Sequence, residues 1–304
     1  MNLHRRAHVL LRPGVAVSFL LVALIWGSTW FVIKDQLAAA PPSWSITWRF
    51  VIATVAMAVL AWRAEGTLRM SREGHLIALG IAFTQFVCNF NFFYRAELHL
   101  TSGIVAVLFA MLMVPNAVLG RVMLGSEITA RFVLGTGIAL GGIALLLAHE
   151  SMAMPSSASI GLGLAFVVGG IVSASIANVL QATKAAQSTP MLVMLAWAMG
   201  WGALGDAIFA FAVSGPPVAP VSMRYWGGIA YLAIIGSVVT FPLYFKLIRE
   251  LGPGRAAYNG VLVPVVAMAI STVFEGFRWS GLAIGGAVLA MIGLVVALRG
   301  RVEG

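Results

Sequence analysis

Charge is scarce in this sequence. Only 10% of the 304 residues are charged, 61% are hydrophobic, and the mean hydropathy is +0.98. Soluble globular proteins have about 25% charged and about 45–50% apolar residues, so this composition excludes an ordinary soluble domain. The net charge of +9 does not indicate nucleic acid, because the basic residues are scattered between apolar runs. We expect the lipid bilayer as a partner and no nucleic acid.

Cysteine and the short motifs of hydrolases are also missing. Cys88 is the single cysteine, which excludes an intramolecular disulfide and a cysteine metal cluster. Neither H-E-x-x-H nor G-x-S-x-G occurs. An intramembrane aspartyl protease needs two aspartates inside spans, and only Asp206 lies well within one. We therefore expect neither an enzyme nor a cofactor or metal. A channel stays an alternative, although nothing resembles the repeated charge or carbonyl rings of an ion filter.

Long apolar runs dominate what is present. A membrane span needs about 20 apolar residues, and the short connections between the runs leave no room for a soluble domain. The sequence predicts an all-α integral membrane protein with ten transmembrane helices. The predicted spans are 14–33, 44–62, 75–94, 101–123, 130–148, 160–181, 190–212, 224–246, 255–275 and 279–298.

The distribution of lysine and arginine predicts the orientation of the chain. With a cytoplasmic N-terminus, fourteen of the nineteen basic residues fall on the cytoplasmic side and five outside. Cytoplasmic loops of membrane proteins carry such an excess. We expect a multi-pass protein of a bacterial-type inner membrane, with both termini cytoplasmic.

One pattern occurs twice along the chain. PNAVLGRVMLGSE covers 115–127, and PVVAMAISTVFE covers 264–275. Pro115 and Pro264 are 149 residues apart, and Glu127 and Glu275 are 148 apart. We predict two homologous five-helix halves, 1–151 and 152–304. Because five is odd, the second half enters the membrane upside down, which is a recurring plan of secondary transporters that work by alternating access.

These stretches resemble a known family. WGSTWFVIKDQLAAAPPSWSITWRF at 26–50 resembles the opening helices of EamA-type members of the drug/metabolite transporter superfamily. The two Pro…Glu stretches, each followed ten residues later by Gly137 or Gly285, resemble its repeated closing motif, although VFE lacks the Leu-Gly before the second glutamate. The resemblance implies a ten-helix exporter of small metabolites. The aromatic-rich third helix is similar to that of YddG-type amino-acid exporters.

A central substrate site needs polar or aromatic groups at mid-membrane. Gln85, Asn89 and Phe93 fall at i, i+4 and i+8, on one stripe of a helix. An amide at that depth is costly unless it faces protein or water, whereas paired aromatic residues also occur in ordinary packing. The further cavity candidates are Trp26, Ser175, Asn178, Phe241, Tyr244 and Tyr258.

The small number of buried charges narrows the substrate. Arg49 is expected near the outer end of the second span, where it would hold helices together. A nearly uncharged interior favours a neutral or zwitterionic solute over a phosphorylated one, which would need deep Lys or Arg. Amino acids, including large apolar and aromatic ones, fit this description. Another neutral metabolite or drug, or uncoupled facilitation, stays open.

Prolines and one carboxylate are candidates for the moving parts. Pro115, Pro242 and Pro264 each remove an amide donor inside a span, so their kinks either gate the cavity or only shape the packing. Asp206 either binds a proton that drives export or bonds a neighbouring group. Two small-residue pairs, Gly137-x-x-x-Gly141 and Gly281-x-x-x-Gly285, predict close packing within one chain, which is compatible with a monomer.

The inverted repeat makes a direct prediction about topology. Single cysteines introduced as Ser157→Cys and Gly304→Cys should react with a membrane-impermeant thiol reagent from opposite sides of the membrane. Labelling of both cysteines from the same side would contradict the inversion of the second half.

Overall fold

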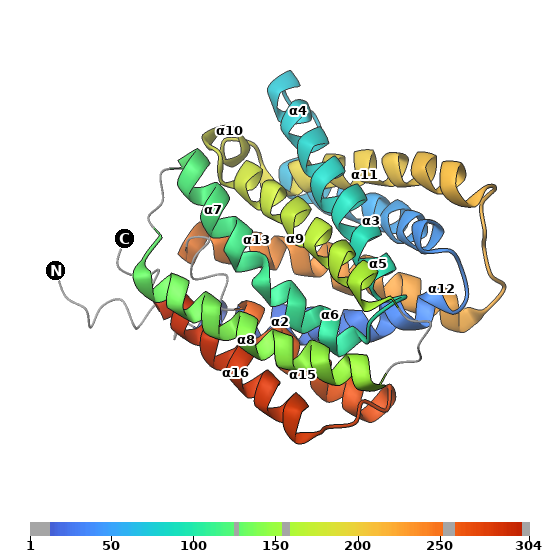
Figure 1. Ribbon diagram of the computed structural model, residues 1–304. Helices are drawn as coiled ribbons and strands as arrows, with labels where there is room; N and C mark the ends of the chain where they lie inside the picture. The colour runs from blue at the N-terminus through green and yellow to red at the C-terminus, as the bar shows by residue number, and fades with distance from the viewer. Residues whose placement is uncertain (1–12, 125–127, 154–158, 252–258, 300–304) are drawn as a thin grey trace.

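The computed structural model describes residues 13–124, 128–153, 159–251 and 259–299 (Figure 1). Throughout these ranges the chain forms helices joined by short connections, and no strand occurs in them. The prediction of an all-α protein is confirmed.

The helices follow each other with few interruptions. They are α2 (Pro13–Leu37), α3 (Pro42–Glu65), α4 (Arg72–Ile81), α5 (Phe90–Ala96), α6 (Ser102–Phe109), α7 (Met113–Leu124), α8 (Ala130–Ala153), α9 (Ile160–Ala182), α10 (Lys184–Gln187), α11 (Met191–Ser214), α12 (Met223–Ala230), α13 (Thr240–Leu251), α15 (Asn259–Phe274) and α16 (Gly281–Arg299). A π-helical segment, Ala82–Asn89, joins α4 to α5, and a second, Tyr231–Val239, joins α12 to α13. A 3₁₀ turn, Ala110–Leu112, joins α6 to α7.

Local sequence sets several of these boundaries. The Ser71 hydroxyl accepts a hydrogen bond from the Gly74 amide at 3.0 Å and caps α4, as serine commonly does at a helix N-terminus. Gly66 ends α3 with a φ of 69°, a left-handed conformation that glycine adopts without steric cost.

Length and hydropathy identify the membrane spans. In the described part of the chain, eight helical stretches are long and apolar enough to cross a bilayer, from Gly14–Leu37 to Met223–Leu247. The last two, Leu262–Phe274 and Gly281–Ala297, are apolar but shorter. The protein is therefore a multi-pass membrane protein, whereas the count of ten spans stays a prediction for these last two helices.

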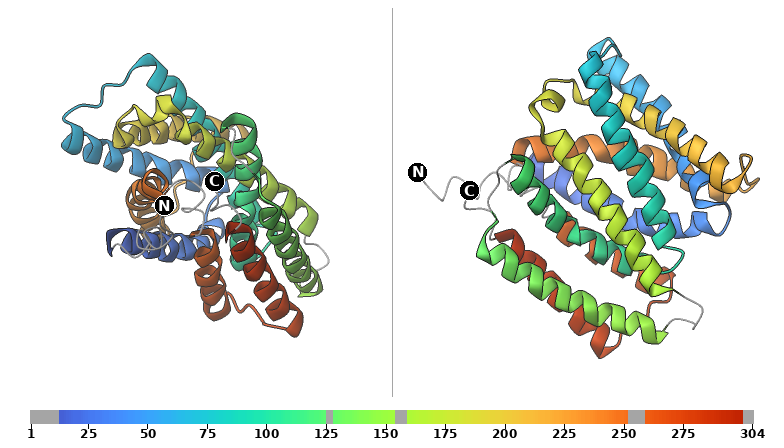
Figure 2. Two further views of the ribbon diagram at one scale, coloured as in Figure 1. Left: turned by 90° about the vertical axis from the view of Figure 1, so that its left-hand side faces the viewer. Right: turned by 45° about the horizontal axis from the view of Figure 1, so that its top comes forward.

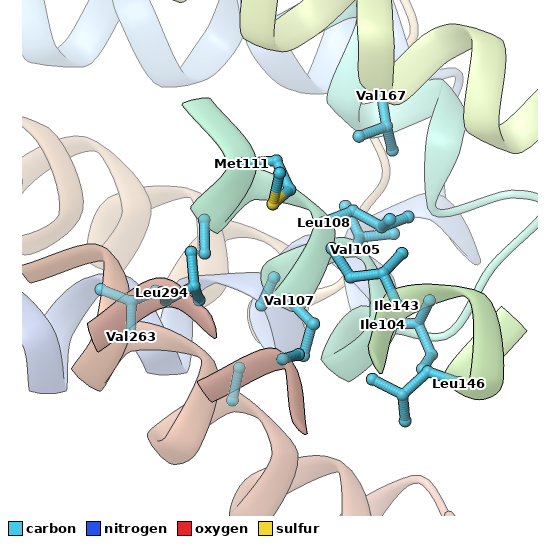
Figure 3. Close-up of a cluster of buried hydrophobic side chains, with 14 of the residues drawn as sticks. Ile104, Val105, Val107, Leu108, Met111, Ile143, Leu146, Val167, Val263 and Leu294 are labelled. Carbon is cyan, nitrogen blue, oxygen red and sulfur yellow. The ribbon is translucent and has the colours of Figure 1, made fainter. Parts of the chain in front are cut away.

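Two long helix pairs stand on opposite sides of the bundle. Figures 1 and 2 show α8 beside α16 on one side and α3 beside α11 on the other. The remaining spans fill the space between these pairs. Helix α6 lies in this interior, where Ile104, Val105 and Leu108 pack with side chains from the neighbouring helices (Figure 3).

Contacts between the two predicted halves come in matching sets. Helix α2 packs on α15 as α9 packs on α7, and α2 contacts α13 as α9 contacts α5. Helix α3 contacts the Tyr231–Val239 segment as α11 contacts Ala82–Asn89. The two π-helical segments themselves begin 149 residues apart, at 82 and 231. That separation equals the spacing of Pro115 and Pro264.

The three predicted kink sites differ in their local structure. The 3₁₀ turn Ala110–Leu112 directly precedes α7, in which Pro115 is the third residue. Pro242 follows the second π-helical segment by three residues. In contrast, α15 continues as an α-helix through Pro264. The equivalent prolines of the two predicted halves therefore lie in helices of different shape.

Helices α8 and α16 touch backbone to backbone, but through other glycines than those predicted. Cβ atoms added at Gly137, Gly281 or Gly285 would meet nothing within 4 Å, and one at Gly141 would reach only the Leu289 side chain. The close approach instead uses a different face of each helix. A Cβ at Gly135 would strike the Ala297 backbone, one at Gly142 that of Ala290, and one at Gly293 that of Ala139. The prediction that both helices pack through small residues has the correct helices and the wrong face.

This contact predicts a difference between two glycines of one helix. Gly142→Val should lower the stability of the folded protein by at least about 1–3 kcal/mol, because the added atoms meet backbone that cannot move aside. Thermal unfolding in detergent, followed by the monodisperse fraction on size exclusion, measures the loss. Gly137→Val makes the same change in helix propensity at an exposed position and serves as the control. Equal stabilities for the two variants would contradict the observed register.

Candidate functional site

A cavity lies in the interior, bordered by α2, α3, two helical segments of the third span (Ala82–Asn89 and α5), α6, α9, α13 and α15. The space open to the centres of water molecules has a volume of about 80 Å³. Seven of the nine candidates that were predicted from the sequence line this cavity: Trp26, Gln85, Asn89, Phe93, Asn178, Phe241 and Tyr244.

The other two candidates do not join them. Ser175 is fully buried in α9, and the neighbouring Ala174 lines the cavity in its place. Ser175 therefore does not line the cavity in this structure, because it lies one residue, or about 100° around the helix, from Ala174. Tyr258 lies outside the described residues.

The amides form a short chain of hydrogen bonds on one wall. Gln85 Nε2 donates to Asn89 Oδ1 at 3.2 Å, and Asn89 Nδ2 donates to the Gly170 carbonyl of α9 at 2.9 Å. Among the described residues, the Gln85 side-chain oxygen accepts no hydrogen bond. Nearby, Asn178 Nδ2 donates to Asn116 Oδ1 of α7 at 3.4 Å. This wall therefore presents a free acceptor at Gln85.

Aromatic rings form the apolar walls. The Trp26 ring lies 4.8 Å from Tyr244 and 5.7 Å from Phe241, measured between ring centroids. The Trp30 ring lies 5.4 Å from Phe93. The Trp26 indole donates to the Gly236 carbonyl at 3.3 Å, whereas the Trp30 indole N–H is buried without an acceptor among the described residues. Such surfaces suit an apolar solute, and Trp30 adds an unused donor.

The cavity wall also carries a fixed positive charge, that of Arg49, which was expected near the outer end of the second span. Arg49 lines the cavity and is only 2% exposed. Its guanidinium donates to Ser237 Oγ at 3.1 Å, to Tyr94 OH at 3.3 Å and to the Gly236 carbonyl at 3.4 Å. It also lies 4.5 Å from the centre of the Phe90 ring. Arg49 contacts neighbouring helices, as expected, and it also gives the nearly uncharged interior one fixed charge at the cavity wall.

Arg49 is a cation without an anion. In the part of the chain that the structure describes, no carboxylate oxygen lies within 4.0 Å of its guanidinium. All the acceptors that it does have are neutral. A buried charge is normally paired or coordinated, so an unpaired guanidinium at a cavity wall is suited to receive an anionic group from a bound molecule. The sequence already indicated such a position for Arg49, because an arginine seven residues inside a 24-residue helix usually faces a cavity or a partner.

One π-helical segment lines the cavity, and the other holds the arginine at its wall. Ala82–Asn89 supplies Gln85 and Asn89, and Tyr231–Val239 supplies the Gly236 carbonyl and the Ser237 hydroxyl that hold Arg49. The wider π turn disturbs the usual hydrogen-bond ladder and recurs at functional sites. Here the Gly236 carbonyl accepts hydrogen bonds from both Arg49 and Trp26.

Asp206 takes part in a separate polar network. Its Oδ1 accepts from Asn91 Nδ2 at 2.7 Å. Asn91 Oδ1 in turn accepts from Arg95 at 2.8 Å and from Ser43 at 2.9 Å. These contacts join α3, α5 and α11, and none of the four side chains lines the cavity. Of the two alternatives for Asp206, the hydrogen-bonded role has a described partner, and proton coupling stays a prediction.

Comparisons with known proteins agree with this picture. The model of the EamA-like transporter family matches residues 14–148 and again residues 161–299. A probable amino-acid metabolite efflux pump of Escherichia coli (strain K12) is 26% identical, with 93% of this chain and 94% of that protein covered. The uncharacterized transporter YyaM of Bacillus subtilis (strain 168) is 25% identical, with 93% of each covered.

Two further comparisons give a relative named for a particular substrate and a solved structure with a similar fold. A probable terminal-alkyne amino-acid exporter of Streptantibioticus cattleyicolor is 24% identical over 93% of this chain and 92% of that protein. A solved crystal structure of a protein superposes with a TM-score of 0.70 at 19% identity, over 95% of this chain and 98% of the other, a likeness that shows the fold alone. Because the two family matches together span most of the sequence, the protein belongs to the EamA-like transporter family.

Proposed function

We propose that this protein exports amino acids across a bacterial inner membrane by alternating access. The observation that carries the proposal is Arg49, a buried cation at the cavity wall with no carboxylate partner among the described residues. Two relatives are named for amino-acid efflux or export, which supports the same substrate class. Transport, rather than catalysis, is the activity of the family to which the chain belongs.

The cavity has a complement for each part of an amino acid. The substrate carboxylate would take the place of the missing anion at Arg49, since a guanidinium binds a carboxylate through two parallel hydrogen bonds. The ammonium group would donate to the free Gln85 oxygen. An apolar side chain would pack on the rings of Trp26, Phe241 and Tyr244.

The size of the cavity bears on the range of substrates. About 80 Å³ is open to the centres of water molecules, which is several times the about 10–15 Å³ that a single water needs. This suits an amino acid with a small or medium side chain. Export of large apolar and aromatic amino acids remains part of the proposal, and it requires aromatic side chains of the wall to change rotamer.

The access route follows from the ends of the cavity. A smaller adjoining cavity shares Trp26 and Tyr244 with the first and is also lined by Asn116 of α7 and by Asn259 and Gly260 at the start of α15. Under the proposed topology α15 starts on the inner side, so we propose that the substrate enters from that side. The matched contacts and matched π-helical segments support two inverted five-helix halves, about 1–151 and 152–304, that exchange conformations. Pro115, Pro242 and Pro264 are the proposed bending sites of that exchange.

The substrate class can be tested with a pair of closely related molecules. In proteoliposomes, leucine should give saturable flux and compete with other amino acids, whereas leucinamide should compete at least tenfold more weakly. The amide lacks the negative charge that Arg49 binds, and charged hydrogen bonds contribute about 1.5–3 kcal/mol. A nucleotide sugar and a cationic dye serve as comparison solutes. Flux of either of these without amino-acid flux would assign the protein to another substrate class.

Removal of the charge provides the second test. Arg49→Gln should weaken binding of free amino acids tenfold or more and abolish the preference for leucine over leucinamide. Arg224→Gln is the matched control, because Arg224 is exposed and pairs with Asp35 on the surface. Size exclusion reports the folded amount, and Arg49→Lys retains the charge without the planar fork. Unchanged preference in Arg49→Gln would contradict the proposed carboxylate site.

The amide wall gives a third prediction. Gln85→Leu should reduce the transport rate without reducing the folded amount, because only a free acceptor and its bond to Asn89 are lost. Asn89→Ala should reduce both, since it also removes the hydrogen bond that ties this segment to α9. Thr84→Ala in the same segment bonds only its own helix and should transport at the parental rate. Parental transport by the Gln85 and Asn89 variants would remove this wall from the site.

A further inference from the structure

A second group of ionisable side chains lies away from the cavity, where the end of α2, the connection 97–101 and the end of α15 meet. Glu97 directly follows α5 and is 0% exposed. Both of its carboxylate oxygens are buried, and neither has a hydrogen-bond partner among the described residues. An ionised carboxylate needs donors or water around it, and the described part of the chain supplies no donor here.

The neighbouring cation, Lys34, does not supply a hydrogen bond to the Glu97 carboxylate. Lys34 Nζ donates to the backbone carbonyls of Glu97 and Leu100, the latter at 3.1 Å, rather than to the Glu97 carboxylate. Its ammonium group thereby fastens α2 to the connection 97–101. The contact is a charge-assisted hydrogen bond to peptide oxygen, and it leaves the glutamate side chain unpaired.

A second carboxylate, that of Glu275, disfavours the ionised form of Glu97. Glu275 Oε2 accepts from Ser102 Oγ at 2.5 Å, and its Oε1 is buried without a partner. The charged or titratable groups that act on Glu97 are Lys34 from α2, Glu275 from the end of α15, and Tyr94 on the helix that leads to it. Burial raises the pKa of the Glu97 carboxyl well above its usual range, Lys34 opposes this rise, and Glu275 adds to it.

We propose that Glu97 is a proton-binding site that controls this end of the bundle. Protonated Glu97 is neutral and stays buried, so the α2, α6 and α15 ends remain together as in this structure. Ionised Glu97 requires water, which it reaches only when these ends separate. The proton comes from the water on that side of the membrane, and no other reactant takes part.

The direction of the pH effect follows from linkage. The closed arrangement binds the proton more tightly than the open one, so it is favoured at low pH and loses its advantage as pH rises through the Glu97 titration. For a single proton, the ratio of open to closed protein rises up to tenfold per pH unit. The proton site itself does not depend on the proposed transport cycle. Its consequence for transport does: under that cycle, the pH on the releasing side sets how often that side opens.

Thiol accessibility tests the site without any substrate. In a Cys88→Ser background, Leu100→Cys places the only thiol at a position that is 0% exposed in the closed arrangement. Leu98→Cys, at an exposed position of the same connection, corrects for the pH dependence of the reagent and reports which side of the membrane this end faces. A failure of the proposed orientation is therefore distinguishable from a failure of the proton site. The quantity measured is the rate of maleimide labelling at Leu100→Cys divided by that at Leu98→Cys.

We expect this ratio to rise at least threefold between pH 6 and pH 8.5. Adding Glu97→Gln, which cannot ionise, should hold the ratio at its low-pH value throughout, whereas Glu97→Asp should restore a pH response. Asp35→Asn removes a carboxylate at the same end that pairs with Arg224, and it should leave the pH response unchanged. A flat ratio in the parental background, or a full pH response in the Glu97→Gln variant, would overturn the proposal.

Discussion

A guanidinium buried among membrane helices must find its hydrogen-bond acceptors inside the protein, because the bilayer provides none. Arg49 meets this requirement with three neutral oxygens from α5 and the Tyr231–Val239 segment. Its position fixes how α3, α5 and the eighth span approach each other, and so defines one end of the cavity. Neutral acceptors satisfy the geometry of the cation and leave its charge uncompensated. The same contacts therefore stabilise the helix arrangement and prepare the site for an anion.

The two π-helical segments supply several of the groups that form this site. A regular α-helix would use the Gly236 carbonyl within its own ladder. In this π-helical segment the same carbonyl accepts from Arg49 and Trp26. Gly236 itself leaves room for close approach, since a Cβ there would lie 3.0 Å from Thr29. The segment Ala82–Asn89 similarly turns Gln85 and Asn89 toward the cavity. The site thus depends on two irregular stretches held within otherwise regular spans.

The sequence was sufficient for the eight longer spans and for much of the cavity lining, but not for contacts between distant helices. Apolar length alone predicted 160–181 for a helix observed at Ile160–Ala182. The i, i+4 spacing correctly put Gln85 and Asn89 on one stripe, because neighbours on a helix face are fixed by local geometry. The environment of Arg49 could not be predicted, since its acceptors are 45 to 188 residues away in the chain. The prediction of which glycines of α8 face α16 was wrong for the same reason. Many spacings occur among 33 glycines, and only the crossing with α16 selects Gly135 and Gly142.

The different helix shapes at Pro115 and Pro264 have a consequence for how the two halves can evolve. One proline follows a 3₁₀ turn, and its counterpart lies within an unbroken α-helix. Under the proposed cycle, each half must later adopt the shape that the other holds now, so each sequence is selected for two structures at once. A substitution that improves one shape at the expense of the other would stabilise the isolated half and slow the complete carrier. Duplicated halves under this constraint can diverge in the residues that line the cavity, but they must keep the energy difference between the two helix shapes small.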